Sequence, residues 1–96
     1  MAKIDKKAKY NEFSKVDDKY CIGGQEIFHI NKSNSGWTWY QTQKPKVKPT
    51  SQDVLYGYVE GHEAEWGSWY ASDMENPDIF SVPKENWNNI ASLASL

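Results

Sequence analysis

Alternation of large hydrophobic and polar residues dominates the middle of the chain. In residues 37–43, Trp37 and Trp39 fall on one side of an extended segment, since successive side chains of a strand point to opposite faces. Residues 54–60 and 65–71 show the same alternation and are separated from one another by turn-forming residues. We therefore predict three neighbouring antiparallel strands, with both tryptophans on one face of the sheet.

Two glycine-containing stretches refine this pattern. Residues 18–30 carry hydrophobic runs on both sides of Gly23-Gly24, a dipeptide that supplies the positive φ angles of a tight hairpin turn. Gly57 lies inside one of the predicted strands and indicates a bulge or the close approach of a neighbouring aromatic residue. Residues 78–82 predict a further short extended segment.

Both ends of the chain show helical spacing instead. Residues 4–16 predict a short amphipathic helix, and residues 83–96 predict a C-terminal helix that begins at Pro83. Ser72 and Glu75 have the spacing of a capping box, which predicts one helical turn. The residues expected on the inner face of the C-terminal helix are Trp87, Ile90, Ala91 and Ala94, with Leu93 beside them.

These elements predict a single domain over residues 1–96 of the α+β class. Its antiparallel sheet has about four to five strands, flanked by a short N-terminal helix and a C-terminal helix. Aromatic residues make up 15% of the 96 residues, including five tryptophans, so rings must supply much of the core. Trp37, Trp39 and Trp87 are the expected core tryptophans.

Charge is distributed unevenly along the chain. All eleven basic residues are lysines, and ten of them precede residue 51, whereas eight of the thirteen acidic residues follow it. The absence of arginine weakens sequence-specific recognition of nucleic acid, because arginine is the preferred reader of guanine edges. The single cysteine excludes an intramolecular disulfide, which fits a reducing cytoplasm, and no apolar stretch predicts a signal peptide or a membrane span.

Candidate chemistry is sparse. His62 and Glu63, with Glu60 or Glu65, could ligate a divalent metal, but their turn-like segment is more typical of solvated charges. Cys21 could act as a nucleophile with His29 as its base, although no motif supplies an oxyanion hole or an orienting acid. We therefore predict no enzyme activity, no cofactor and no metal.

A resemblance covers roughly residues 36–76. The strand motif W-T-W-Y-x-T, matched by residues 37–42, and the following Y-G-Y-V-E-G-H-E-A-E-W-G are similar to domain-of-unknown-function family 2958. Further matching positions are Ser72, Met74 and Glu75. The departures are Trp66, where the family has leucine, and residues 68–71. The resemblance implies an antiparallel α+β domain in an accessory protein of a plasmid, integrative element or phage, and it implies no chemistry.

The segment from residue 60 to residue 78 is the strongest candidate for a binding surface. It contains six acidic residues and no basic one, together with aromatic residues that cannot all face inward from one strand. Tryptophan and tyrosine are common anchors of protein interfaces, and carboxylates steer a basic partner. The predicted partner-binding residues are Glu60, His62, Glu63, Glu65, Trp66, Trp69, Tyr70, Asp73 and Glu75.

The predicted function is therefore a non-enzymatic protein-binding module acting in a bacterial host cytoplasm. With the family context, its partner would be a host protein with a basic surface, such as a nucleic-acid-handling enzyme or a CRISPR- or restriction-type defence protein that the module inhibits by occlusion. The alternative is a nucleic-acid-binding accessory domain. It would use the sheet aromatics for base stacking, with Lys44, Lys46 and Lys48 as the basic flank.

Overall fold

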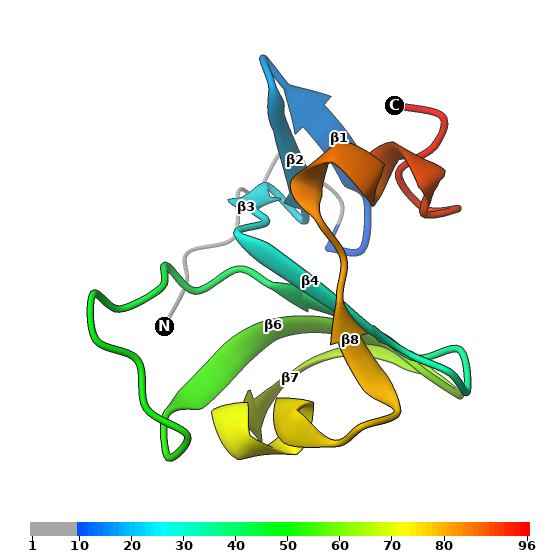
Figure 1. Cartoon of the computed structure of the whole chain (residues 1–96). Helices are drawn as coiled ribbons and strands as arrows, with labels where there is room; N and C mark the ends of the chain where they lie inside the picture. The colour runs from blue at the N-terminus through cyan, green and yellow to red at the C-terminus, as the bar shows by residue number, and fades with distance from the viewer. Residues whose placement is uncertain (1–9) are drawn as a thin grey trace.

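The computed structural model describes residues 10–96 and places them in two antiparallel sheets (Figure 1). The smaller sheet has the strand order β1-β2-β3 and the larger has the order β7-β6-β5-β4-β8. The strands are β1 (Phe13–Val16), β2 (Lys19–Ile22), β3 (Gln25–Glu26), β4 (His29–Ser33), β5 (Thr38–Gln41), β6 (Val54–Glu60), β7 (Ala64–Tyr70) and β8 (Ile79–Ser81). Two 3-10 helices follow β7 and β8, namely η1 (Ala71–Glu75) and η2 (Lys84–Asn89).

The larger sheet is built around three strands that the alternation of residues predicted. β5, β6 and β7 are consecutive antiparallel neighbours, with Trp39 opposite Val59 and Tyr40 opposite Tyr58. The predicted hairpin turn at Gly23-Gly24 is also confirmed, since both glycines have positive φ and join β2 to β3. The prediction of neighbouring antiparallel strands is therefore correct.

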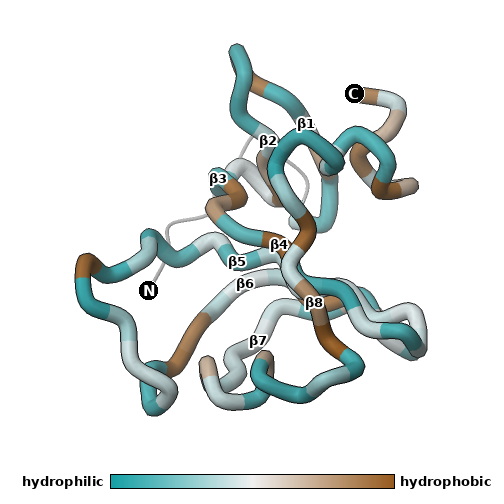
Figure 2. The backbone as a smooth tube through the Cα atoms, viewed as in Figure 1, coloured by the Kyte–Doolittle hydropathy of each residue, from teal (hydrophilic) through white to brown (hydrophobic). Residues whose placement is uncertain are grey.

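The core fills the space between the two sheets and the C-terminal segment. Tyr40 and Ile30 have no exposed surface and project from the larger sheet toward the smaller one. Figure 2 shows hydrophobic stretches in β4, in β8 and in the segment after η2. The buried hydrophobic cluster comprises Tyr20, Ile22, Ile27, Ile30, Tyr40, Tyr58, Trp87, Ile90 and Leu93.

The prediction that Trp37 and Trp39 belong to this core is wrong. They share one face of the sheet, as predicted, but it is the face away from the smaller sheet, and both side chains are only partly buried. The alternation within β5 fixes this result, because Tyr40 occupies the core and its neighbour Trp39 must point the other way. Of the three expected core tryptophans, only Trp87 is part of the core cluster.

The α+β class is also contradicted, because the described residues contain strands and 3-10 turns but no α-helix. Of the predicted N-terminal helix, residues 4–9 lie outside the described residues, and Phe13–Val16 form β1. Phe13 packs edge-on against Tyr40 and Tyr58, with ring centroids 5.0 and 5.9 Å away. Pairing with β2 and this ring packing outweigh the loose helical spacing, since local propensity is a weak prior.

The predicted C-terminal helix is a series of 3-10 turns. The backbone N–H groups of Ile90 and Leu93 donate to the carbonyls of Trp87 and Ile90, three residues earlier. The three buried residues of this segment, Trp87, Ile90 and Leu93, are also spaced by three, which matches the 3.0-residue period of a 3-10 helix rather than 3.6. Asn88 and Asn89, both poor helix formers, are the last two residues of η2. The fold is thus mainly β.

Tyr40 anchors a hydrogen-bonded bridge at one side of the core. Its hydroxyl donates to the Glu60 carboxylate at 2.6 Å, and the Ser92 hydroxyl donates to the same carboxylate at 3.0 Å. Burial, followed by the bond to Glu60, raises the pKa of the Tyr40 phenol far above its ordinary value of 10.0. Glu60 therefore ties β6 to the C-terminal segment.

No helix in the described part of the chain is long and apolar enough to span a bilayer.

This bridge predicts a loss of stability at alkaline pH. Above pH 10 the unfolded chain releases the Tyr40 proton and the folded chain retains it, so stability falls as pH rises, by about 1.4 kcal/mol per pH unit. Urea unfolding at pH 9 to 11.5 would measure the slope. In Tyr40→Phe the free energy of unfolding should fall less steeply with pH, because the release of about one proton on unfolding is lost. An unchanged slope would show that Tyr40 ionises normally in the folded state.

Candidate functional site

The outer face of the larger sheet, opposite the core, carries two hollows. We call the first the tryptophan hollow. Its volume is about 550 Å³, and β5, β6, β7 and the turns beside them line it. The lining residues are Trp37, Trp39, Val59, His62, Glu63, Glu65, Gly67, Ser68 and Trp69.

Aromatic packing holds one wall of the tryptophan hollow in place. The rings of Trp37 and Trp39 stack with their centroids 6.0 Å apart, and His62 meets Trp37 edge-on at 5.8 Å. Gly61 lies against the Trp37 ring so closely that a Cβ there would be 2.6 Å from three ring atoms. The floor is open, because a Cβ on Gly67 would have no neighbour within 4 Å.

Negative charge borders the tryptophan hollow. Glu63 and Glu65 are both exposed, and neither takes part in an ion pair among residues 10–96. Trp69, only 8% exposed, has a buried indole N–H without a hydrogen-bond partner. An unsatisfied buried donor is costly, and no group among residues 10–96 accepts from this N–H, so an acceptor brought within its reach by a bound molecule would be favourable.

The structure brings together four of the predicted partner-binding residues, His62, Glu63, Glu65 and Trp69. Trp66 points the other way: its ring packs against Tyr58 and its indole N–H donates to the Tyr10 carbonyl at 3.1 Å. Strand alternation separates it from its neighbours in β7. Glu60 belongs to the bridge with Tyr40 and is directed toward the core side.

The remaining predicted residues lie in η1 or directly before it rather than at the tryptophan hollow. Tyr70 is 57% exposed, and the Asp73 carboxylate accepts a hydrogen bond from its backbone N–H at 3.0 Å. Glu75 is exposed at the end of η1. One helical turn was predicted here and a 3-10 turn is present, but its N-cap is Tyr70 rather than Ser72, and Asp73 takes the place in the capping box that was predicted for Glu75.

Trp37 and Trp39 were missed as site residues because they were assigned to the core. The sequence did contain a signal that the two tryptophans could face outward instead. Tyr40 and Thr38 form the other set of this strand, and alternation requires one set to face outward. Periodicity alone does not say which set is inside.

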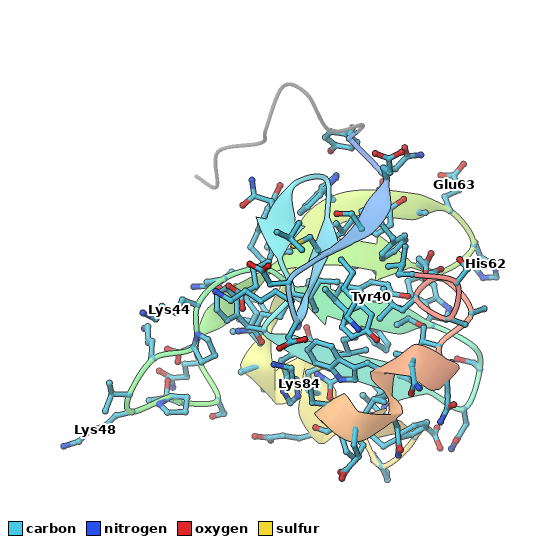
Figure 3. The ribbon with its side chains drawn as sticks, turned by 90° about the horizontal axis from the view of Figure 1, so that it is seen from above. Tyr40, Lys44, Lys48, His62, Glu63 and Lys84 are labelled. Carbon is cyan, nitrogen blue, oxygen red and sulfur yellow. The ribbon has the colours of Figure 1, made fainter. Side chains whose placement is uncertain are left out.

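The second hollow, which we call the amide hollow, lies beside the loop between β5 and β6 and has a volume of about 420 Å³. Asn31, Gln41 and Gln43 contribute amides to it, and Lys44 and Lys46 stand among its lining residues. Figure 3 shows Lys44 and Lys48 at one end of the molecule and His62 and Glu63 at the other. The same sheet face is therefore positive at one end and negative at the other.

The residues considered for catalysis and for metal binding are not brought together. Cys21 lies in the smaller sheet and its thiol is directed to the Lys19 carbonyl, whereas His29 lies in β4 and contacts the Ser81 hydroxyl at 3.1 Å. Burial raises the pKa of the Cys21 thiol, which disfavours the reactive thiolate. Among residues 10–96 no group of three or more histidine, cysteine or acidic side chains could hold a metal ion.

No protein-family model, curated protein or solved structure matches the chain. The two hollows and their charges are thus the observations from which a function can be argued.

Proposed function

We propose that the protein is a non-enzymatic binding module whose tryptophan hollow docks a basic segment of another protein. The observation that carries this proposal is the partly buried Trp37–Trp39 stack beside the carboxylates of Glu63 and Glu65, which form no ion pair among residues 10–96. Large rings left partly exposed on a sheet face can bury further apolar area when a partner binds.

Charge complementarity selects the partner class. Glu63 and Glu65 are exposed and lack cationic partners among the described residues, so a lysine or arginine of another protein could pair with them. Tryptophan faces also attract cations through their ring quadrupole. The carboxylates would speed the encounter, and the rings would slow dissociation.

The specific form of this proposal is inhibition by occlusion in the cytoplasm of a bacterial host. A basic surface that handles nucleic acid, in a CRISPR- or restriction-type defence protein for example, would be covered by the acidic and aromatic face. This narrower statement rests on the resemblance to domain-of-unknown-function family 2958 alone.

The test uses a variant that fills the tryptophan hollow. Gly67 lines the hollow and a Cβ there would meet no atom within 4 Å, so Gly67→Leu should fold normally and reduce partner capture from bacterial lysate by about tenfold or more. Captured proteins would be quantified by mass spectrometry after nuclease treatment. Gly67→Leu removes no side-chain contact, so a loss of partner capture would be attributable to the filled hollow.

Charge variants separate this proposal from the nucleic-acid alternative. Glu63→Lys combined with Glu65→Lys should slow association with the captured partner, whereas reversal of Lys44, Lys46 and Lys48 should leave it unchanged. Loss of binding in the lysine variants alone, with a steep salt dependence on generic DNA, would reject the protein-binding proposal in favour of a nucleic-acid-binding domain.

A further inference from the structure

The amide hollow has the size and composition of a small-molecule site. Its volume of about 420 Å³ falls within the range of roughly 300–1,000 Å³ that is usual for ligand pockets. It lies on the same sheet face as the tryptophan hollow, and the described structure gives the two hollows no lining residue in common. An inference about it therefore does not rest on the proposed protein-binding function.

One side of the amide hollow is polar and preorganised. The Ser81 hydroxyl donates to the Asn31 side-chain oxygen at 3.2 Å and also contacts His29 at 3.1 Å. Gln41 donates its side-chain N–H to the backbone carbonyl of Gln43 at 2.9 Å. These bonds hold the side chains in place before any ligand arrives, which lowers the entropy cost of binding.

The Gln43 side chain provides the clearest indication of a ligand. Its amide oxygen is buried and has no hydrogen-bond partner in the described part of the chain, although the residue lines the hollow. Leaving such an acceptor unpaired costs free energy, so turning the amide toward the hollow to accept an N–H from a bound molecule would be favourable. The ligand must therefore carry a hydrogen-bond donor.

Apolar side chains supply the other walls. Leu55, Met74 and Ile79 come from β6, η1 and β8, and Pro45 comes from the loop between β5 and β6. Apolar walls beside a row of amides suit a flat ring with polar edges, because the ring faces contact the apolar groups while the edges reach the amides.

An unpaired cation is also among the lining residues. Lys46 pairs with Asp53 at 3.0 Å, and the backbone N–H of Thr50, together with Lys46, lowers the pKa of that carboxyl group. Asp53 is the only acidic residue among those that line the amide hollow in the described structure. Lys44 has no ion-pair partner among residues 10–96 and remains available to an anion.

We propose that the amide hollow binds a nucleoside monophosphate, with the base against Gln41 and Gln43 and the phosphate at Lys44. A nucleobase combines the flat ring, the N–H donor and the acceptors that this lining requires, and its phosphate supplies the anion. A free nucleotide and the terminal nucleotide of a single strand present the same chemistry.

Isothermal titration calorimetry with AMP, GMP, CMP and UMP, and with the four matching nucleosides, tests the proposal. At least one nucleotide should bind saturably with a stoichiometry of one. Lys44→Glu should lower the affinity for that nucleotide by about tenfold and leave the affinity for its nucleoside unchanged, because only the phosphate contacts the lysine. Gln43→Leu should weaken nucleotide and nucleoside alike by about fivefold to tenfold.

Lys48→Glu is the matched control, since it makes the same charge change in the same loop but Lys48 does not line the hollow. It should leave binding within about twofold of wild type. Thermal melts would establish that the variants are folded. Absence of saturable binding by all four nucleotides would overturn the proposal, as would equal weakening of nucleotide and nucleoside by Lys44→Glu.

A short single-stranded oligonucleotide with the preferred base at its end is the last ligand to be titrated. Tighter binding of the oligonucleotide than of the free nucleotide would assign the site to strand ends, and the reverse order would assign it to free nucleotides. Gly67→Leu should leave either affinity unchanged. Loss of nucleotide binding in that variant would mean that the two hollows are one site and would overturn the independent assignment.

Discussion

Gly57→Ala is expected to abolish the native fold. A Cβ at this position would overlap the carbonyl oxygen of Tyr40 and lie 2.9 Å from its carbonyl carbon, and both are backbone atoms of the adjacent strand. No rotamer change can relieve that overlap, so β6 would have to separate from β5 in the middle of the larger sheet. We expect a loss of more than about 4 kcal/mol, measured by urea unfolding followed by circular dichroism.

Gly67→Ala is the matched control, because Gly67 pairs directly with Gly57 across β6 and β7. Its added Cβ would meet no atom within 4 Å. Removing a glycine also reduces the entropy of the unfolded chain, so the variant should be unchanged or more stable by about 0.4–1 kcal/mol. Equal destabilisation by the two alanines would show that the close approach of β5 is not what requires Gly57.

Tyr40→Ala carries the second large effect. Tyr40 has no exposed surface, contacts Phe13 and Tyr58, and donates to Glu60, so its truncation should cost about 3–5 kcal/mol. Trp39→Ala, one residue away, removes a larger but partly exposed ring and should cost less than about 2 kcal/mol. The two free energies of unfolding, measured in the same denaturant series, give the comparison.

The order of these two costs decides which face of the sheet is the core. If Trp39→Ala proved as damaging as Tyr40→Ala, the tryptophan side of the sheet would be packed against other residues and could not be a docking surface. A small cost for Trp39→Ala together with lost partner capture would instead support the tryptophan hollow as a binding site.

Several elements could be predicted from the sequence because their signals are local. The alternation in residues 37–43, 54–60 and 65–71 reflects the two-residue period of a strand and survives in β5, β6 and β7. Gly23-Gly24 similarly specifies a turn through backbone sterics alone. Such features depend on neighbouring residues and require no knowledge of the rest of the fold.

The predicted helices failed for the opposite reason. Phe13 is in a strand because it pairs with Ile22 across the β1–β2 hairpin and packs on Tyr40, which is distant in sequence. The C-terminal segment follows a period of three because Trp87, Ile90 and Leu93 all have to reach the core. A short run of hydrophobic residues fits periods of 3.0 and 3.6 almost equally well, so packing determined the outcome.

The candidate site shows the same division. The residue pattern predicted that Trp37 and Trp39 share a face and that Glu63 and Glu65 lie near a turn. Which face is covered depends on packing between distant segments, because the smaller sheet and the C-terminal segment pack on the Tyr40 side. That choice left the tryptophans on the open face and placed the lysine-rich loop beside Asn31, Gln41 and β8. A strand pattern fixes the relative orientation of side chains, but burial depends on contacts with segments far away in the chain.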